Sequence, residues 1–244
     1  MNQKGTMTQS PPDDRPPAAE PPAGTDTATA SDKVADAILR GIRAGTFATG
    51  QHLVEPDLMR RLGISRGSLR EALKRLAAEG IVTLNRFRGA YISSFDRKTV
   101  FDLLQMLEPM FCLAARLAAE HCDTAEKLAR VQAVTASIEA AAARRNRADY
   151  MEQRRNFYSV LIEVGGNSEL MRAMPLARTE LFRAQIEAAL SERQRQLHAG
   201  GYGRISRAVI ERNPAAAERA MKKHFASTHK TISELPDHVF VAAS

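Results

Sequence analysis

Hydrophobic residues recur at helical spacing in the stretch 53–92, which reads LVEPDLMRRLGISRGSLREALKRLAAEGIVTLNRFRGAYI. Leu58 and Leu62 are four residues apart and therefore share one face of a short helix. Gly63 can end that helix in the left-handed conformation, and Ser65 can cap a second, longer helix. The inward positions of the second helix are Leu69, Ala72, Leu73 and Leu76. The pattern predicts two helices joined by a tight turn.

The residues on either side complete this unit. Gly80 ends the second helix, and the β-prone segments 81–84 and 90–92 can pair antiparallel across a tip at 85–89. An upstream helix, capped by Ser31, carries apolar positions that can pack beneath the second helix: Val34, Ile38, Leu39, Ile42 and Phe47. We therefore expect a winged helix-turn-helix, a DNA-binding fold, over residues 31–95.

Residues 96–235 read as a second, all-helical domain rich in leucine, alanine and arginine. We expect helices over 98–121, 124–146, 148–164, 168–190, around 202–212 and over 214–234, with interruptions at 165–167, 200–201 and 213–214. Because no strand pattern appears, the predicted fold is mainly α, a winged helix-turn-helix with a small β-hairpin wing followed by an antiparallel helical bundle. Residues 1–30, rich in proline and alanine, read as a disordered tail, and 236–244 as a C-terminal tail.

Charge supports a nucleic-acid partner. The chain has a net charge of +7, and residues 31–95 hold 11 Lys/Arg against 6 Asp/Glu. A positive domain suits a phosphate backbone, because each neutralised phosphate releases counterions. No apolar run approaches the roughly 20 residues that span a bilayer, and no signal peptide opens the chain, so we expect a soluble cytoplasmic protein.

The sequence resembles the GntR family of bacterial regulators, in particular the FadR subfamily with an FCD-type helical domain. The matching pieces are KVADAILRGIRAGTF, ATGQHLVEPDL, LGISRGSLREALKRLAAEG and RGAYI in the first domain. In the second they are LEPMFCLAARLAAEH, NFYSVLIEVGGNSEL and ISRAVIERNPAAAERAMKKHF. Gly67-Ser68 departs from the Thr-Pro that many members carry at the start of this helix. The resemblance implies a homodimeric transcriptional regulator, most often a repressor, that binds an inverted-repeat operator and a small-molecule effector.

The second helix of the motif would enter the major groove with its first residues facing the bases. Arg66 and Arg70 are the candidates for reading guanine, and the wing arginines Arg86 and Arg88 for the minor groove. Arg43, like Arg40, could touch phosphate. The full candidate set is Arg40, Ser65, Arg66, Gly67, Ser68, Arg70, Arg86, Arg88 and Gly89. The alternative for each arginine is a solvated or salt-bridged surface residue.

Several polar residues occupy positions of the bundle where periodicity predicts core. They are Arg154 and Tyr158 in the third expected helix, Tyr202 in the fifth and His224 in the last. Buried polar groups need partners, and convergent ones mark a ligand site. The alternatives are an arginine that extends to the surface, tyrosines that are ordinary core residues, and a structural histidine.

The resemblance changes how these positions are interpreted. FCD-type members typically bind a divalent metal through one Asp and three His. Arg154 stands at the place of the Asp, Tyr158 and Tyr202 at two places of the His, and only His224 keeps its ligand identity. A guanidinium cannot coordinate a cation, and neutral phenols are poor ligands. We therefore expect no metal cofactor, and an effector carboxylate that pairs directly with Arg154.

Two other functions are alternatives to an effector-dependent regulator. One is an architectural DNA-binding protein with a vestigial pocket. The other is an enzyme, but no glycine-rich phosphate loop, HExxH or CxxC motif is present. Cys112 and Cys122 are too few for a disulfide framework and read as small buried residues.

Overall fold

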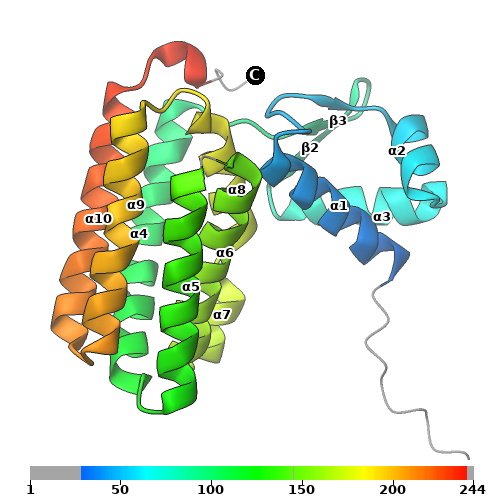
Figure 1. The fold of residues 1–244 in the computed structure, drawn as a ribbon. Coiled ribbons are helices and arrows are strands. Elements are labelled where there is room, and N and C mark those ends of the chain that lie inside the picture. Colours follow the sequence, from blue (N-terminus) through cyan, green and yellow to red (C-terminus); the bar gives the residue numbers. More distant parts are fainter. Residues whose placement is uncertain (1–28, 145, 241–244) are drawn as a thin grey trace, which may run out of the picture.

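The computed structural model describes residues 29–144 and 146–240, which form two units side by side (Figure 1). The first unit holds α1 (Ala30–Ala44), β1 (His52–Leu53), α2 (Glu55–Leu62), α3 (Arg66–Ala78), β2 (Val82–Asn85) and β3 (Gly89–Ile92). The second holds α4 (Arg97–His121), α5 (Ala125–Arg144), α6 (Arg147–Gly165), α7 (Ser168–Ala173), α8 (Leu176–Glu187), α9 (Glu192–Ile210), α10 (Pro214–Glu234) and η1 (Asp237–Val239). The predicted fold class, a winged helix-turn-helix followed by a helical bundle, is confirmed. Most of the predicted N-terminal tail, residues 1–28, lies outside the described residues.

The first helix begins earlier than the sequence pattern indicated. The side chain of Thr29, not that of Ser31, accepts a hydrogen bond from the Asp32 amide at 3.1 Å, and the Asp32 carboxylate accepts one from the Thr29 amide at 2.9 Å. This reciprocal capping box satisfies two amides of the first turn. Helix α1 therefore starts at Ala30, inside the segment predicted as tail.

The wing belongs to a three-stranded antiparallel sheet rather than an isolated hairpin. The strand order is β1-β3-β2, with Leu53 opposite Ala90 and Asn85 opposite Gly89. Strand β1 has only two residues, too few to show a period of two, so the sequence pattern did not reveal it. The predicted strands shift slightly, to 82–85 and 89–92.

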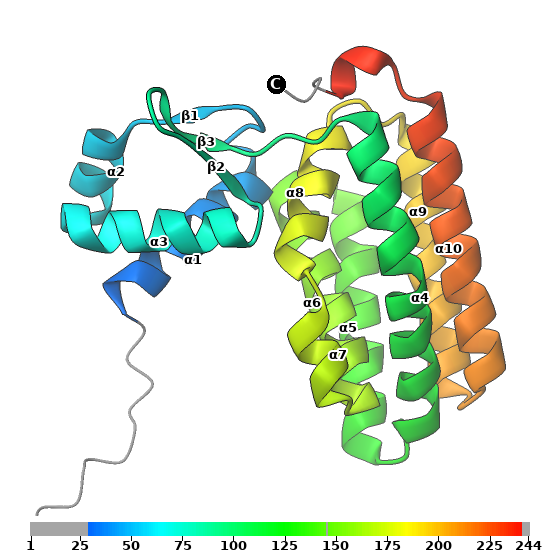
Figure 2. The ribbon, with the colours of Figure 1, turned by 180° about the vertical axis from the view of Figure 1, so that it is seen from behind.

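Five long helices of the second unit form a closed ring in the order α4, α6, α5, α9 and α10. Figure 2 shows α6, α7 and α8 on the side that faces the winged unit. The predicted helix 168–190 is divided into α7 and α8, with Pro175 at the N-cap of α8. The predicted break at 200–201 is wrong, because both glycines lie inside α9. Among the described residues, no helix is long and apolar enough to cross a lipid bilayer.

Part of the predicted C-terminal tail packs against the bundle. Residues 237–239 form η1, and Phe240 is buried with its ring centre 4.3 Å from the guanidinium carbon of Arg97. Arg97 also donates to the carbonyl of Leu235 at 2.6 Å. The chain is thus held to the start of α4 up to residue 240, and residues 241–244 lie outside the described part.

Helix α8 connects the two units. Glu180 of α8 accepts a hydrogen bond from Arg43 of α1 at 2.8 Å, and Gln185 of α8 exchanges two hydrogen bonds with the backbone of Phe95 in the linker, at 2.9 and 2.8 Å. Arg43 also pairs with Glu152 of α6 at 2.8 Å. The idea that Arg43 contacts phosphate is therefore wrong, because its side chain is buried between the units.

Candidate functional site

Helix α3, the second helix of the helix-turn-helix, carries exposed basic residues at its start. The Ser65 hydroxyl caps α3 by accepting from the Ser68 amide at 3.1 Å. Arg66 occupies the first position of α3, and Arg70 follows one turn later; both side chains are exposed. Gly67 is exposed as well, and because it has no side chain, the backbone of α3 can come close to a DNA surface there. The start of α3 is therefore accessible to the base edges of a DNA groove without local unfolding of the domain.

The tip of the wing is a tight turn that presents two arginines. The Asn85 side chain accepts from the amides of Phe87 and Arg88, at 3.0 and 3.1 Å. Gly89 has a φ of 86°, a left-handed conformation that favours glycine. Arg86 and Arg88 are exposed on either side of Phe87, which is 90% exposed. Arg40, on α1, is exposed too.

The four polar residues singled out in the bundle come together inside its ring. Tyr158 and His224 share a hydrogen bond of 3.2 Å between the phenol oxygen and Nε2. The guanidinium carbon of Arg154 lies 5.0 Å from the centre of the Tyr158 ring, and the Tyr202 ring packs 4.9 Å from that of His224. All four side chains are buried. The structure therefore places Arg154, Tyr158, Tyr202 and His224 in one cluster, and we name it the buried cluster.

Three further residues belong beside this cluster, and sequence reasoning missed them. His198 shares a 3.2 Å hydrogen bond with Tyr202 through Nε2, and its ring lies 4.1 Å from that of His224. Arg183 of α8 and Tyr150 of α6 are buried next to each other, 5.8 Å from guanidinium carbon to ring centre. The four-residue spacing of His198 and Tyr202 was the available signal. The glycines at 200, 201 and 203 mask this helical spacing, because glycine-rich stretches are typical of loops.

Arg154 is a buried cation without a carboxylate partner within ion-pairing distance in the described part of the chain. Its Nε lacks a hydrogen-bond partner among the same residues. The nearby carboxylate of Glu180 is already paired with Arg43 and with Arg155, at 2.8 and 3.1 Å. A buried charge in this state is costly, and an anion placed beside it would lower that cost.

The other groups of the cluster are neutral. Burial, with the positive charges of Arg154 and Arg183, lowers the pKa of His224 to about 3. Burial and the neighbouring His224 hold the pKa of His198 well below its ordinary value. Burial also raises the pKa of the Tyr158 and Tyr202 hydroxyls, so both phenols keep their protons. Two imidazoles and two phenols can therefore donate or accept hydrogen bonds around the one strong cation.

The donor set does not suit the divalent metal that the resemblance implies. The set includes the guanidinium of Arg154, which cannot coordinate a cation, and the Nε2 atoms of His198 and His224 are already engaged by tyrosine hydroxyls. Within residues 29–144 and 146–240, no three His, Cys, Asp or Glu side chains are grouped so that they could hold an ion.

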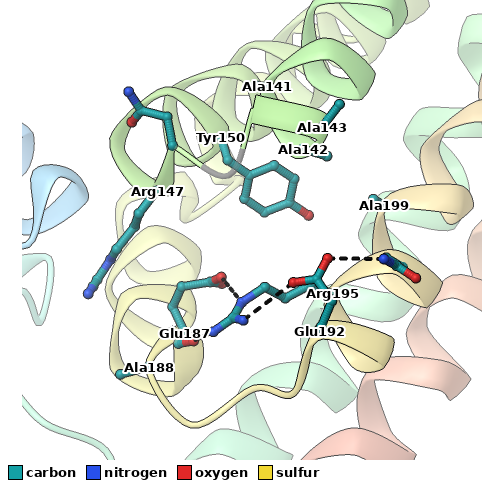
Figure 3. Close-up of a pocket in the computed structure, with 12 residues that line it drawn as sticks. Ala141, Ala142, Ala143, Arg147, Tyr150, Glu187, Ala188, Glu192, Arg195 and Ala199 are labelled. Atoms are coloured by element: carbon teal, nitrogen blue, oxygen red, sulfur yellow. Dashed lines mark hydrogen bonds and ion pairs between the residues drawn. The ribbon is translucent and has the colours of Figure 1, made fainter.

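Two cavities of very different size lie in the bundle, and only the smaller one is lined by members of the buried cluster. The inner cavity, between Arg154, Tyr158, His198 and His224, measures about 10 Å³, which is about the space of one water molecule. The outer cavity measures about 640 Å³ and opens between α5, α6, α8 and α9 (Figure 3). Its wall includes Arg147, Tyr150, Glu187, Arg195 and Gln196, alongside a series of alanines.

Gly201 allows α9 to approach His224 closely, and its replacement by alanine should destabilise the fold. A Cβ at this position would lie 2.1 Å from Nδ1 of His224, so the imidazole must move. Overpacking of this kind costs about 1–3 kcal/mol. The matched control is Gly200→Ala, whose Cβ would meet only Arg204, at 3.5 Å. That change should be neutral or stabilise the helix by up to about 1 kcal/mol. Urea unfolding followed by circular dichroism checks both, and equal stability of the two variants would contradict this register of α9.

The buried histidines make stability depend on pH. Their pKa values are lowered in the folded state, so below about pH 6.5 the unfolded chain binds protons that the folded chain does not. Stability should therefore be fully present above pH 6.5 and fall as the pH drops toward 3, by about 1.4 kcal/mol per pH unit for each histidine. The measurement is urea unfolding between pH 7 and pH 4. His224→Gln should reduce the slope, whereas the exposed His238→Gln should leave it unchanged. Equal slopes in the two variants would count against a neutral His224.

Two family models match the chain. The model of bacterial regulatory proteins, gntR family, matches residues 30–92. The FCD domain model matches residues 99–227, which is more than half of the chain.

Curated relatives and solved structures agree with these matches. The Glc operon transcriptional activator of Escherichia coli strain K12 is 25% identical over 227 residues, covering 83% of this chain and 88% of the relative. The uncharacterized HTH-type transcriptional regulator YdhC of Bacillus subtilis is 22% identical over 181 residues, covering 74% and 81%. Among solved structures, E. coli McbR/YncC superposes with a TM-score of 0.74 at 15% identity, covering 84% of this chain and 98% of that one. A putative GntR regulator from Rhodococcus gives 0.72 at 21%, covering 83% and 97%.

Proposed function

The chain belongs to the GntR family of bacterial regulatory proteins, with an FCD domain behind its winged helix-turn-helix, and we propose that it is a metal-independent, carboxylate-responsive repressor. It is a transcriptional regulator and not an enzyme, as the family and the relatives show. The observation that carries the proposal is the buried Arg154, which has no carboxylate partner among the described residues and is surrounded by neutral hydrogen-bonding groups.

The DNA-binding part of the proposal concerns a two-fold dimer on an inverted repeat. Regulators with this motif place one recognition helix in each half-site, so operator symmetry follows protein symmetry. Arg66 and Arg70 are proposed to read base edges, because both are exposed at the start of α3. Ser65, Gly67 and Ser68 would lie against the same groove. Arg86, Arg88 and Gly89 on the wing would meet the adjacent minor groove, with Arg40 on phosphate.

The effector part concerns an anion held by Arg154. A guanidinium matches a carboxylate in a bidentate pair, which is a stronger and more directional contact than a single hydrogen bond. Tyr158, Tyr202 and His224 are close enough to one another to hold the remaining polar atoms of such a ligand. Effector binding would then replace the missing carboxylate partner of a buried cation.

Helix α8 gives this binding event a route to the DNA-binding unit. Thr179 and Phe182 of α8 line the inner cavity, while Glu180 of the same helix pairs with Arg43 of α1. Helix α1 in turn packs against α3. A shift of α8 on effector binding would therefore change the position of the recognition helix, provided that the effector prefers one of the two states.

The effector proposal is tested by a thermal-shift screen of metal-stripped, full-length protein against small carboxylates and divalent cations. We expect a carboxylate to raise the melting temperature without added metal, because it neutralises the buried Arg154. Isothermal titration with zinc and nickel is the companion measurement. Stoichiometric binding of either ion at the working pH, or stabilisation only in its presence, would overturn the metal-independent site.

Repression is distinguished from activation by a reporter gene behind the bound operator, in cells with and without the protein. Higher reporter output without the protein supports repression, and lower output supports the role named for the Glc operon relative. One alternative function is supported by a specific observation. The inner cavity of about 10 Å³ holds no carboxylate as it stands, which fits an effector-independent DNA-binding protein with a vestigial pocket. That rival predicts that no compound in the screen changes stability or operator affinity.

A further inference from the structure

Buried polar atoms without hydrogen-bond partners are concentrated in one part of the protein. Within the described residues there are seven such side-chain atoms, and six of them lie at the outer cavity or between it and Arg154. These six are Arg147 Nε, Tyr150 Oη, Glu187 Oε2, Arg183 Nε, Arg183 Nη2 and Arg154 Nε. Native proteins satisfy nearly all buried polar atoms. Arg183 Nε and Glu187 Oε2 face each other as an ion pair at 2.9 Å, so the atoms that call for a further partner are the other four. A series of exceptions that leads from one cavity to the next indicates a polar passage.

Tyr150 lies between the two cavities. Its side chain lines the outer cavity, where Figure 3 shows the ring extending into the space opposite Glu187 and Arg195. The same ring packs 5.8 Å from the guanidinium carbon of Arg183, which is buried behind it. Tyr150 therefore lies between a cavity of about 640 Å³ and Arg183, whose charge acts on His224 of the buried cluster. Cavities of this size commonly hold small-molecule ligands.

The passage contains more positive than negative charge. Arg183 faces Glu187 at 2.9 Å, but neither Nε nor Oε2 is aligned for a hydrogen bond. The other oxygen of Glu187 accepts from Arg195 Nε at 3.0 Å, so one carboxylate is shared by two guanidinium groups. Arg154 adds a third guanidinium with no carboxylate of its own within ion-pairing distance in the described chain. An anion that reaches this point would meet two buried arginines with unused N–H donors.

We propose that the outer cavity is the entrance chamber of the buried cluster, that the Tyr150 side chain closes the passage between them, and that Arg183 is the second arginine that holds the anion. The proposal rests on the proposed function, because it takes the ligand to be a small organic anion. The anionic group lies between Arg154 and Arg183, the polar atoms next to it meet Tyr158, Tyr202 and His224, and the far end of the ligand extends into the outer cavity. Asn146 and Gln196 line that cavity and offer amide groups to a polar body.

The test measures access to the buried cluster and needs neither effector nor DNA. Thr228 lines the inner cavity and is buried, so Thr228→Cys places a thiol there in a chain whose native thiols are removed by Cys112→Ala and Cys122→Ala. The thiolate is alkylated by iodoacetate, an anion, or by neutral iodoacetamide; in both cases a sulfur–carbon bond forms and iodide leaves. Mass spectrometry of the intact, full-length protein gives the two rates.

The passage is tested by opening and by blocking it. Tyr150→Ala should raise both alkylation rates by about tenfold or more, because the closing ring is gone. Ala188→Trp, which fills the outer cavity, should lower them, whereas Ala136→Trp on the exposed face of α5 should not. Tyr150→Phe keeps the ring and should stay slow. Unchanged rates in Tyr150→Ala would overturn the role of Tyr150, and if that variant does not fold, the comparison of Ala188→Trp with Ala136→Trp decides.

The role of Arg183 is tested by the preference for the anion. The measured quantity is the ratio of the alkylation rate with iodoacetate to the rate with iodoacetamide. This ratio should be several-fold higher in the Thr228→Cys parent than in the same protein with Arg183→Met. Arg193→Met, at an exposed position of α9, should leave the ratio unchanged. An unchanged ratio in Arg183→Met would exclude the anion role. Failure of these access experiments would leave the effector proposal standing, since the ligand could enter by another path. The absence of any thermal shift in the effector screen would not change the alkylation rates by which access is measured.

Discussion

Replacing Arg66 by alanine is expected to weaken operator binding and to reduce the preference for the operator over unrelated DNA, by about 1–3 kcal/mol of discrimination. The physical reason is the loss of the bidentate contact to a base edge that we propose for Arg66. Arg66 is exposed at the first position of α3 and forms no ion pair within the described part of the chain, so the variant should fold normally. The measurement is binding to the operator and to a scrambled duplex of the same length, over a range of salt concentrations.

Arg40→Ala is the matched control for this experiment. Arg40 lies on α1, beside the end of α2, and its proposed contact is with phosphate. That variant should weaken binding to both duplexes alike and lower the salt dependence by about one counterion. If Arg66→Ala also weakens both duplexes equally, Arg66 holds the backbone and does not read bases.

Replacing Arg154 by methionine is expected to abolish the response to the carboxylate while keeping the protein folded. The change removes a buried, unpaired charge and leaves an apolar side chain of similar length, so the free energy of unfolding should stay equal or rise. The carboxylate should then raise the melting temperature of the parent but not of Arg154→Met. Operator affinity of the variant should no longer change when the carboxylate is added.

Arg155→Met provides a control at the neighbouring residue. Arg155 is half exposed and pairs with Glu180 and Glu152, outside the cluster. This variant loses a positive charge from the same helix turn but should keep the thermal shift. A carboxylate response that survives in Arg154→Met would place the effector elsewhere. A response lost in both variants would mean that the general charge of α6, and not the Arg154 site, controls binding.

The winged helix-turn-helix could be predicted because its signals are local. Leucines at helical spacing, Gly63 at the turn and Ser65 at the cap each act within a few residues, and the structure uses all of them. The same holds for the four polar positions of the bundle, which were visible because a polar residue interrupts an apolar face. Their convergence was suggested by family resemblance, and the structure brings them together.

Arg183 could not be assigned to the site from the sequence, because its place there depends on which face of its helix points into the bundle. Helix α8 is buried on nearly all sides, so its sequence has no apolar stripe to show that Arg183 faces the cluster and that Glu180 faces α1. In the sequence, Arg183 and Glu187 look like an ordinary solvated pair on a helix. Their burial is decided by the packing of α8 between the two units.

The sequence by itself therefore determined the two domain types, the start of the recognition helix and the chemical character of the cluster, since these depend on spacing and residue type. The tertiary structure alone decided the burial of Arg43 between the units, the pairing of His198 with Tyr202, and the division of the site into a small inner and a large outer cavity. These features arise where residues distant in sequence meet. Local periodicity carries no information about which helices become neighbours, because that choice is made by the packing of whole helix surfaces.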